Sequence, residues 1–146
     1  MSRLGQEYVP AARIVAIKDV SVGIPLRNGS VLPDQIFAIR SDEGYLAYAL
    51  EVDRATEPVR STAARKSLKR SVGQYRELLG QGLHKQHYGL KCELVVLWVF
   101  LRRAREAQWR SCFEDSAGRQ RSKVWDADFP RWETFQAAFS DSSVLV

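Results

Sequence analysis

A nearly continuous apolar run, Cys92–Leu101 (CELVVLWVFL), constrains the fold of this chain more than any other segment. It is rich in β-branched and aromatic residues and lacks the alternation of a strand with one solvated face. Such a run predicts a strand at the centre of a sheet, covered on both faces. Its apolar part, 94–101, is only strand-sized, and no apolar run in the chain approaches the length of a membrane span.

Two shorter apolar runs predict a β-hairpin before this central strand. Gln35–Arg40 (QIFAIR) and Tyr45–Val52 (YLAYALEV) are separated by the turn sequence Ser-Asp-Glu-Gly, and both look largely buried. Further upstream, the β-rich segment Arg13–Val20 (RIVAIKDV) predicts the first strand of the sheet. Residues 23–30 carry Gly, Pro and Asn-Gly, which predict a loop.

Two helices are predicted on either side of the central strand. Residues 61–79 form the first, because apolar residues recur there at helical spacing. That stripe consists of Ala64, Leu68, Val72, Tyr75 and Leu79. A polar loop with His84 and His87 follows, without the Cys or acidic cluster that a zinc site needs, and 102–113 form the second helix. Strand, helix, buried strand and helix in this order predict an α/β sandwich.

Aromatic residues predict a short helix near the C-terminus, over about residues 129–140. It follows an exposed loop predicted at 115–122, and Asp128 and Pro130 suit its first turn. The aromatic stripe consists of Trp132, Phe135 and Phe139. We expect this stripe to pack in the core, with docking of a protein partner or of a second copy of the chain as the alternative.

The composition suits one soluble domain with a basic surface. A length of 146 residues is enough for a single domain with its own core. A net charge of +5 suits DNA or another acidic partner, and an ordinary basic domain is an equal alternative. Cys92 and Cys112 are too few for a disulfide framework, and no signal peptide is evident, so we expect a cytoplasmic protein.

Three carboxylates fall at the ends of the predicted hairpin strands. Asp34 precedes the first strand, whereas Glu51 and Asp53 end the second. Because the start of one hairpin strand lies beside the end of the other, Asp34 and Glu51 should meet at one sheet edge. Converging carboxylates can hold Mg²⁺ or Mn²⁺ beside a phosphodiester. Two structural alternatives remain open: Asp34 is a turn residue, and Asp53 pairs with Arg54 or Arg60.

Basic side chains of the following helix are divided by their phase around its axis. At about 100° per residue, Arg65, Lys69 and Arg76 lie together on one flank of the apolar stripe. Lys66 lies nearly opposite the stripe, toward solvent. We therefore expect the flank residues, rather than Lys66, to reach the ends of the strands.

The order of these motifs resembles the PD-(D/E)xK nuclease superfamily. In that fold a central mixed sheet flanked by helices presents an Asp and a Glu at neighbouring strand ends, where they bind a divalent ion, usually magnesium. Pro33-Asp34 is similar to the first motif, and Glu51-Val52-Asp53 to the second. The resemblance implies a restriction-endonuclease-like sandwich formed by the whole chain.

More narrowly, the chain resembles the replication-relaxation family. The similarity lies in VLPD at 31–34 and LEVDRATE at 50–57, followed by a lysine-bearing helix with Tyr75 and by the apolar run with Arg102-Arg103. It covers roughly residues 30–110. Members occur on plasmids and other mobile elements and are linked to plasmid replication and DNA relaxation. They commonly carry a winged-helix part upstream, for which we expect no room here, as in a stand-alone or truncated version.

One position departs from the superfamily pattern. The second motif normally ends in a lysine that steadies the attacking water, and Asp53 stands there instead. Some relatives carry the lysine on the following helix, and helical phase nominates Lys69, with Arg65 or Arg70 behind it. The family's helical lysine lies about one turn before the tyrosine, where this chain has Ser71.

Two functions follow from the resemblance. The first is metal-dependent nicking or cleavage of DNA, with Asp34, Glu51 and Asp53 as metal ligands and Lys69 stabilising the developing charge. Backbone phosphates would be neutralised by Arg65, Arg70, Arg76, Arg102, Arg103 and Arg105. The alternative is a catalytically degenerate protein, either a DNA-binding accessory protein or a protein-interaction module.

Overall fold

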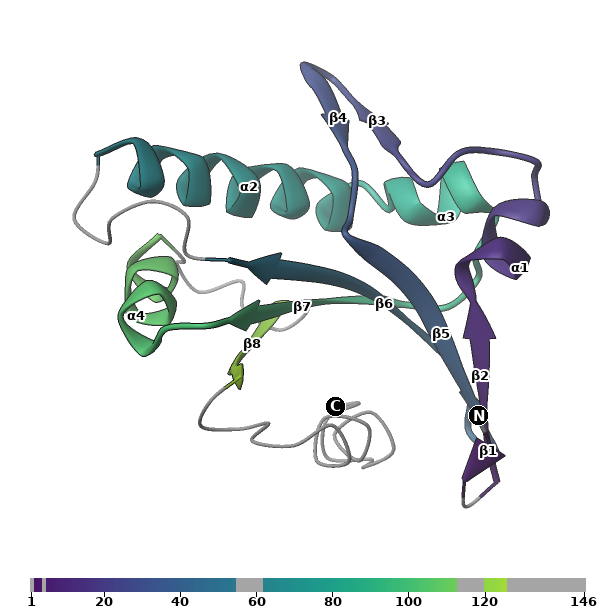
Figure 1. Cartoon of the computed structure of the whole chain (residues 1–146). Coiled ribbons are helices and arrows are strands. Elements are labelled where there is room, and N and C mark those ends of the chain that lie inside the picture. The colour runs from purple at the N-terminus through teal and green to yellow at the C-terminus, as the bar shows by residue number, and fades with distance from the viewer. Residues whose placement is uncertain (1, 4, 55–61, 113–119, 126–146) are drawn as a thin grey trace.

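A single mixed sheet forms the centre of the molecule in the computed structural model (Figure 1). The structure describes residues 2–3, 5–54, 62–112 and 120–125. The sheet has six strands in the order β1-β2-β5-β6-β7-β8. Their bounds are Ser2–Arg3 (β1), Gln6–Pro10 (β2), Gln35–Ser41 (β5), Gly44–Asp53 (β6), Leu94–Phe100 (β7) and Gln120–Val124 (β8).

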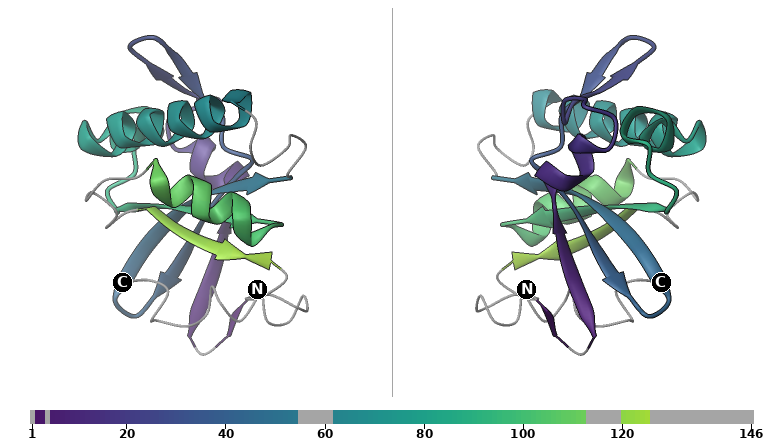
Figure 2. Two further views of the ribbon diagram at one scale, coloured as in Figure 1. Left: turned by 90° about the vertical axis from the view of Figure 1, so that its left-hand side faces the viewer. Right: turned by 90° about the vertical axis from the view of Figure 1, so that its right-hand side faces the viewer.

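Four helices and a separate hairpin complete the described part of the chain. The helices are α1 (Ala11–Ala16), α2 (Thr62–Gly80), α3 (Leu83–Tyr88) and α4 (Arg103–Ser111). The hairpin consists of β3 (Ile24–Leu26) and β4 (Gly29–Val31). Figure 2 shows α4 lying across β7 and β8, with α2 above them and the β3–β4 hairpin projecting beyond α2. None of the described helices is long and apolar enough to cross a membrane.

The directions of the strands bring the ends of several strands to one edge of the sheet. Strands β2, β5 and β6 pair antiparallel, whereas β6, β7 and β8 run parallel. The carboxyl ends of β6 and β7 therefore lie at the same edge of the sheet as the start of β5. This confirms the predicted α/β class, a central mixed sheet flanked by helices.

The core has two clusters, one on each face of the sheet. On one face, Ala49 and Trp98 pack with the buried side chains of all four described helices. On the other face, Tyr48 and Leu97 lie in a smaller cluster, against which Trp125 packs. All seven residues of β7 are buried, which confirms the prediction of a central strand covered on both faces.

The predicted hairpin and the first predicted helix are confirmed. In the hairpin, Gln35 pairs with Leu50 and Ser41 with Gly44, so the turn lies where the sequence placed it. Helix α2 buries the described members of its stripe against the sheet: Leu68, Val72, Tyr75 and Leu79. Hydrophobic periodicity is decisive here because the helix has one broad apolar face.

The prediction of a first strand at 13–20 is wrong. Residues 6–10 form the strand beside β5, and the chain turns into α1 directly after Pro10. Ile14 then points into the core, while Ile17 remains 56% exposed. The β-branched residues of this segment favour a strand, but no strand forms there because residues 7–10 already pair with β5 on that side.

Three predicted loops contain regular structure. Residues 23–30 include most of the β3–β4 hairpin rather than a plain loop. The segment with both histidines is helix α3, flanked by Gly82 and Gly89 in left-handed conformations, and His84 is fully buried. Of the loop predicted at 115–122, residues 120–122 belong to β8. The aromatic helix predicted at 129–140 lies outside the described residues.

Candidate metal and nucleic-acid site

The hairpin register brings two of the predicted acids together. Because Gln35 pairs with Leu50, Asp34 lies opposite Glu51 at the edge where β5 begins and β6 ends. The exposed Asp34 carboxylate accepts a hydrogen bond from the backbone N–H of Val52, with an N to Oδ2 distance of 2.8 Å. This bond ties Asp34 to the last residues of β6 and so closes the end of the hairpin. Asp34 therefore has a structural role, as one of the two alternatives held.

Glu51 lies between the sheet and α2. The hydroxyl of Tyr75, on the buried face of α2, donates a hydrogen bond to the Glu51 carboxylate. The Tyr75 ring in turn packs edge-on against Trp98 of β7, with ring centroids 5.9 Å apart. A carboxylate that ends a buried run needs such a partner, because an unpaired buried charge is strongly unfavourable.

The environment of Glu51 makes it a weaker acid than an ordinary glutamate. Burial raises its pKa to about 7, and the nearby charge of Asp34 acts in the same direction. The hydrogen bond from Tyr75 acts in the opposite direction, because it favours the ionised carboxylate. For Tyr75 itself, burial and the Glu51 charge raise the pKa far above its ordinary value, so its hydroxyl keeps its proton. The pair therefore has a fixed donor and an acceptor that titrates near neutral pH.

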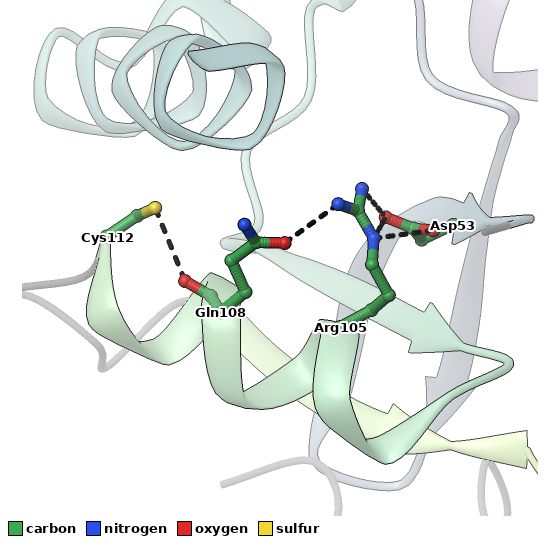
Figure 3. Close-up of polar contacts among 4 residues, drawn as sticks. All are labelled: Asp53, Arg105, Gln108 and Cys112. Atoms are coloured by element: carbon green, nitrogen blue, oxygen red, sulfur yellow. Dashed lines mark hydrogen bonds and ion pairs between the residues drawn. The ribbon is translucent and has the colours of Figure 1, made fainter. Parts of the chain in front are cut away.

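Asp53 is bound by a side chain of α4 (Figure 3). Its carboxylate accepts two close hydrogen bonds from Arg105, at 2.6 Å from Nη2 and 3.2 Å from Nε. Arg105 also donates to Gln108, one turn further along α4. The two charged side chains are only 9% and 7% exposed, so they form a buried ion pair.

The predicted three-acid site is therefore not assembled. Within the described parts of the chain, no three His, Cys, Asp or Glu side chains form a group that could hold a metal. Asp53 does belong to an ion pair, as the alternative held, and among the described residues its partner is Arg105. Arg60, one of the two predicted partners, lies outside the described residues. Helix α4 decides this, because it carries the guanidinium to the end of β6.

Asp34 and Glu51 together still fit a hard divalent cation. Mg²⁺ prefers oxygen ligands and is commonly held by one or two carboxylates, with water and substrate phosphate completing its shell. Two neighbouring acids, one of them desolvated, are also an arrangement that a bound cation stabilises. The donor set suits magnesium or manganese rather than zinc, which favours nitrogen and sulfur.

Lys69, the predicted catalytic lysine, is exposed on α2. It lies about 120° around the helix axis from Tyr75, at 3.6 residues per turn. The side chain one turn before Tyr75, and close to it in phase, is the half-buried Ser71. Helical phase therefore separates Lys69 from the face of α2 that meets Glu51.

The predicted phosphate-binding bases divide by exposure. Arg70 and Arg76 on α2 are exposed, as are Arg102 and Arg103 at the start of α4. Arg105 is the exception, because its guanidinium is buried against Asp53 and is not presented to a phosphate. The side chain of Arg65 lies outside the described part of the structure.

Sequence reasoning missed two participants in this site. Tyr75 was placed in the stripe of α2, which is correct, but its hydroxyl also holds Glu51. The sequence could have indicated this contact, because Tyr75 belongs to the apolar stripe that faces the sheet. Arg105 offered none, because it is 52 residues from Asp53 in sequence and only the packing of α4 joins them.

One family model matches this chain. The model described as replication-relaxation matches residues 11–94, more than half of the sequence. The chain belongs to the replication-relaxation family. The family indicates a role linked to the replication or relaxation of plasmid or mobile-element DNA. No curated protein and no solved structure matches the chain.

The matched region includes the features that define the site. It begins at α1, earlier than the resemblance at 30–110 predicted, and contains the β5–β6 hairpin and α2. It ends at Leu94, so Arg105 and α4 lie beyond it. Asp34, Glu51 and Tyr75 are thus inside the family region, whereas the partner of Asp53 is outside.

Proposed function

We propose that this chain acts on plasmid or mobile-element DNA and nicks or cleaves it with a divalent metal bound by Asp34 and Glu51. The observation that carries the proposal is the meeting of these two carboxylates at one sheet edge, with Glu51 desolvated against α2. A restriction-endonuclease-like relationship to the PD-(D/E)xK superfamily belongs to the same proposal. It is supported by the acids at neighbouring strand ends of a mixed sheet.

The chain's own residues prepare the metal site. Glu51 binds a cation once it loses its proton, and Tyr75 orients its carboxylate throughout because the hydroxyl stays protonated. The Val52 N–H orients Asp34 in the same way. A bound Mg²⁺ would polarise the phosphate and lower the pKa of a water molecule.

DNA would be held through its backbone. Arg70 and Arg76 are exposed on α2, and Arg102 and Arg103 are exposed at the start of α4. Arginines on a surface of this kind neutralise phosphates without reading base sequence, so binding should weaken steeply as salt is added.

The test is nicking of supercoiled plasmid in Mg²⁺ or Mn²⁺, with EDTA as the metal-free arm. Asp34→Asn and Glu51→Gln should each reduce the nicking rate by at least about 100-fold, as removal of a charge-stabilising group does. Asp42→Asn is the matched control, because Asp42 is an exposed acid at the opposite end of the same hairpin. Nicking that needs no metal, or that survives both substitutions, would overturn the proposal.

A second candidate is a DNA-binding accessory protein without cleavage. It is favoured by Asp53, which stands where the superfamily has its lysine, and by the position of Lys69 away from the Tyr75 face. This candidate predicts salt-dependent retention of DNA without nicking. Retention should survive Asp34→Asn and weaken in an Arg70→Gln, Arg76→Gln double variant.

A further inference from the structure

A groove opens beside Asp34, between the start of β5 and residues of the segments around α1. Its volume is about 360 Å³, and its walls are mainly apolar. The lining residues are Ala11, Val22, Leu32, Pro33, Asp34, Gln35 and Ile36. Leu32 is the most exposed large apolar side chain in the described part of the chain, at 70%.

The groove and the proposed metal site share a residue. Asp34 lines the groove, accepts the Val52 N–H and lies near enough to Glu51 to raise its pKa. A ligand with a phosphate at the acid pair could therefore place an adjacent neutral, flat group between Leu32 and the groove wall. An anionic group is disfavoured there, because Asp34 forms one end of the groove.

The surroundings suit a polyanion. The segment that carries Leu32 continues directly from β4, whose hairpin projects beyond α2 with Arg27 exposed near its tip (Figure 1). The hairpin is attached to α2 by a hydrogen bond from the Arg27 N–H to Glu77, at 3.2 Å. Helix α2 carries five basic residues and one acidic residue. Cations thus lie on the hairpin that leads to Leu32 and on α2, to which the hairpin is bound.

We infer that the groove binds an unpaired base of DNA, packed against Leu32, so that the substrate is single-stranded or locally unpaired DNA. This inference rests on the proposed function and names its substrate class. Bases inside an intact duplex are stacked and cannot reach an apolar groove. Apolar side chains that contact DNA typically act as wedges at unstacked bases, which matches an exposed leucine beside a phosphate site.

The experiment measures binding by fluorescence anisotropy with Ca²⁺, a cation with oxygen ligands that can hold a phosphate at the acid pair, and the length of each probe is checked after the titration. The three probes are a single strand, its duplex, and a strand of equal length and charge that lacks all bases. The wild-type protein should bind the single strand about fivefold more tightly than the base-free strand, at the low end of the range for a base stacked on an aromatic side chain, because Leu32 is aliphatic. Leu32→Ala should abolish this preference and leave duplex binding unchanged.

Ile17→Ala is the matched control, because Ile17 is an exposed aliphatic residue directly after α1 that does not line the groove. It should retain the preference for bases. Equal binding of the normal and base-free strands by wild type would overturn the inference. So would a Leu32→Ala variant that weakens binding to all three probes alike.

The two proposals fail separately. If the base preference depends on Leu32 but plasmid is not nicked, the base site stands and the cleavage is overturned. If plasmid is nicked through Asp34 and Glu51 but Leu32→Ala keeps the full preference, the cleavage stands and the base site is overturned.

Discussion

Glu51 links the stability of this protein to pH. Its pKa is raised from 4.5 to about 7 on folding, so between these values the folded chain holds a proton that the unfolded chain has lost. Stability should therefore fall as the pH rises from about 4.5 to about 7 and then level off.

Substitution of Glu51 by Gln should remove this dependence. The variant should be more stable than wild type at pH 8, by up to about 3 kcal/mol, and nearly equal at pH 4. Urea unfolding at pH 4, 6 and 8 measures the difference. Asp42→Asn should keep the wild-type slope, and a Glu51→Gln difference that is constant across this pH range would contradict the prediction.

Tyr75 has a role at the same scale, through a single hydroxyl. Tyr75→Phe removes the donor that favours the ionised Glu51, so the pKa of Glu51 should rise further. We expect a loss of stability of about 1–2 kcal/mol at pH 8 and a smaller loss at pH 5, where the carboxyl is neutral. Equal losses at the two pH values would show that the hydroxyl does not act on the charged form.

At the scale of elements, the Asp53–Arg105 pair fastens α4 to the end of β6. Removing one buried partner leaves the other charge uncompensated, so Asp53→Ala should destabilise the fold by about 3–5 kcal/mol. The double variant Asp53→Leu, Arg105→Met should recover most of this loss, because both charges are gone. Urea unfolding tests both, and a double variant as unstable as Asp53→Ala would contradict the prediction.

The same pair separates structural from metal-binding acids. Asp53→Asn should leave Mg²⁺ affinity within about threefold of wild type. Asp34→Asn should weaken the affinity at least about tenfold, which is the effect typical of losing a residue that supports a metal site. Isothermal titration with Mg²⁺ measures both. A large loss of Mg²⁺ affinity in Asp53→Asn would contradict this prediction and support a site formed by all three acids.

Elements with a strong local pattern were predictable, and those defined by their neighbours were not. Strand β7 and the β5–β6 hairpin follow from unbroken apolar runs and a turn sequence. Helix α1 was missed because its β-branched residues suit a strand, while the place beside β5 is taken by residues 7–10. Helix α3 was missed because the polar residues between Gly82 and Gly89 conceal Leu83 and Tyr88, which pack on the core.

At the scale of the whole molecule, the exposed bases should act together on the DNA backbone. Arg70→Gln and Arg103→Gln should each weaken DNA binding and reduce the slope of log K against log salt by about 1. Arg105→Gln should instead destabilise the fold and leave that slope unchanged while the protein remains folded, because its guanidinium is buried. Binding titrations at several salt concentrations, with circular dichroism on each variant, distinguish these effects.

The meeting of Asp34 and Glu51 was determined by the sequence alone, because a turn of known position and two apolar runs set the hairpin register. The tertiary structure decided what each acid does there. Asp53 follows Glu51 by two residues on the same strand, yet α4 brings Arg105 to it, while α2 brings Tyr75 to Glu51. Local patterns determine which residues share an edge, whereas the packing of distant helices determines which charge each one meets.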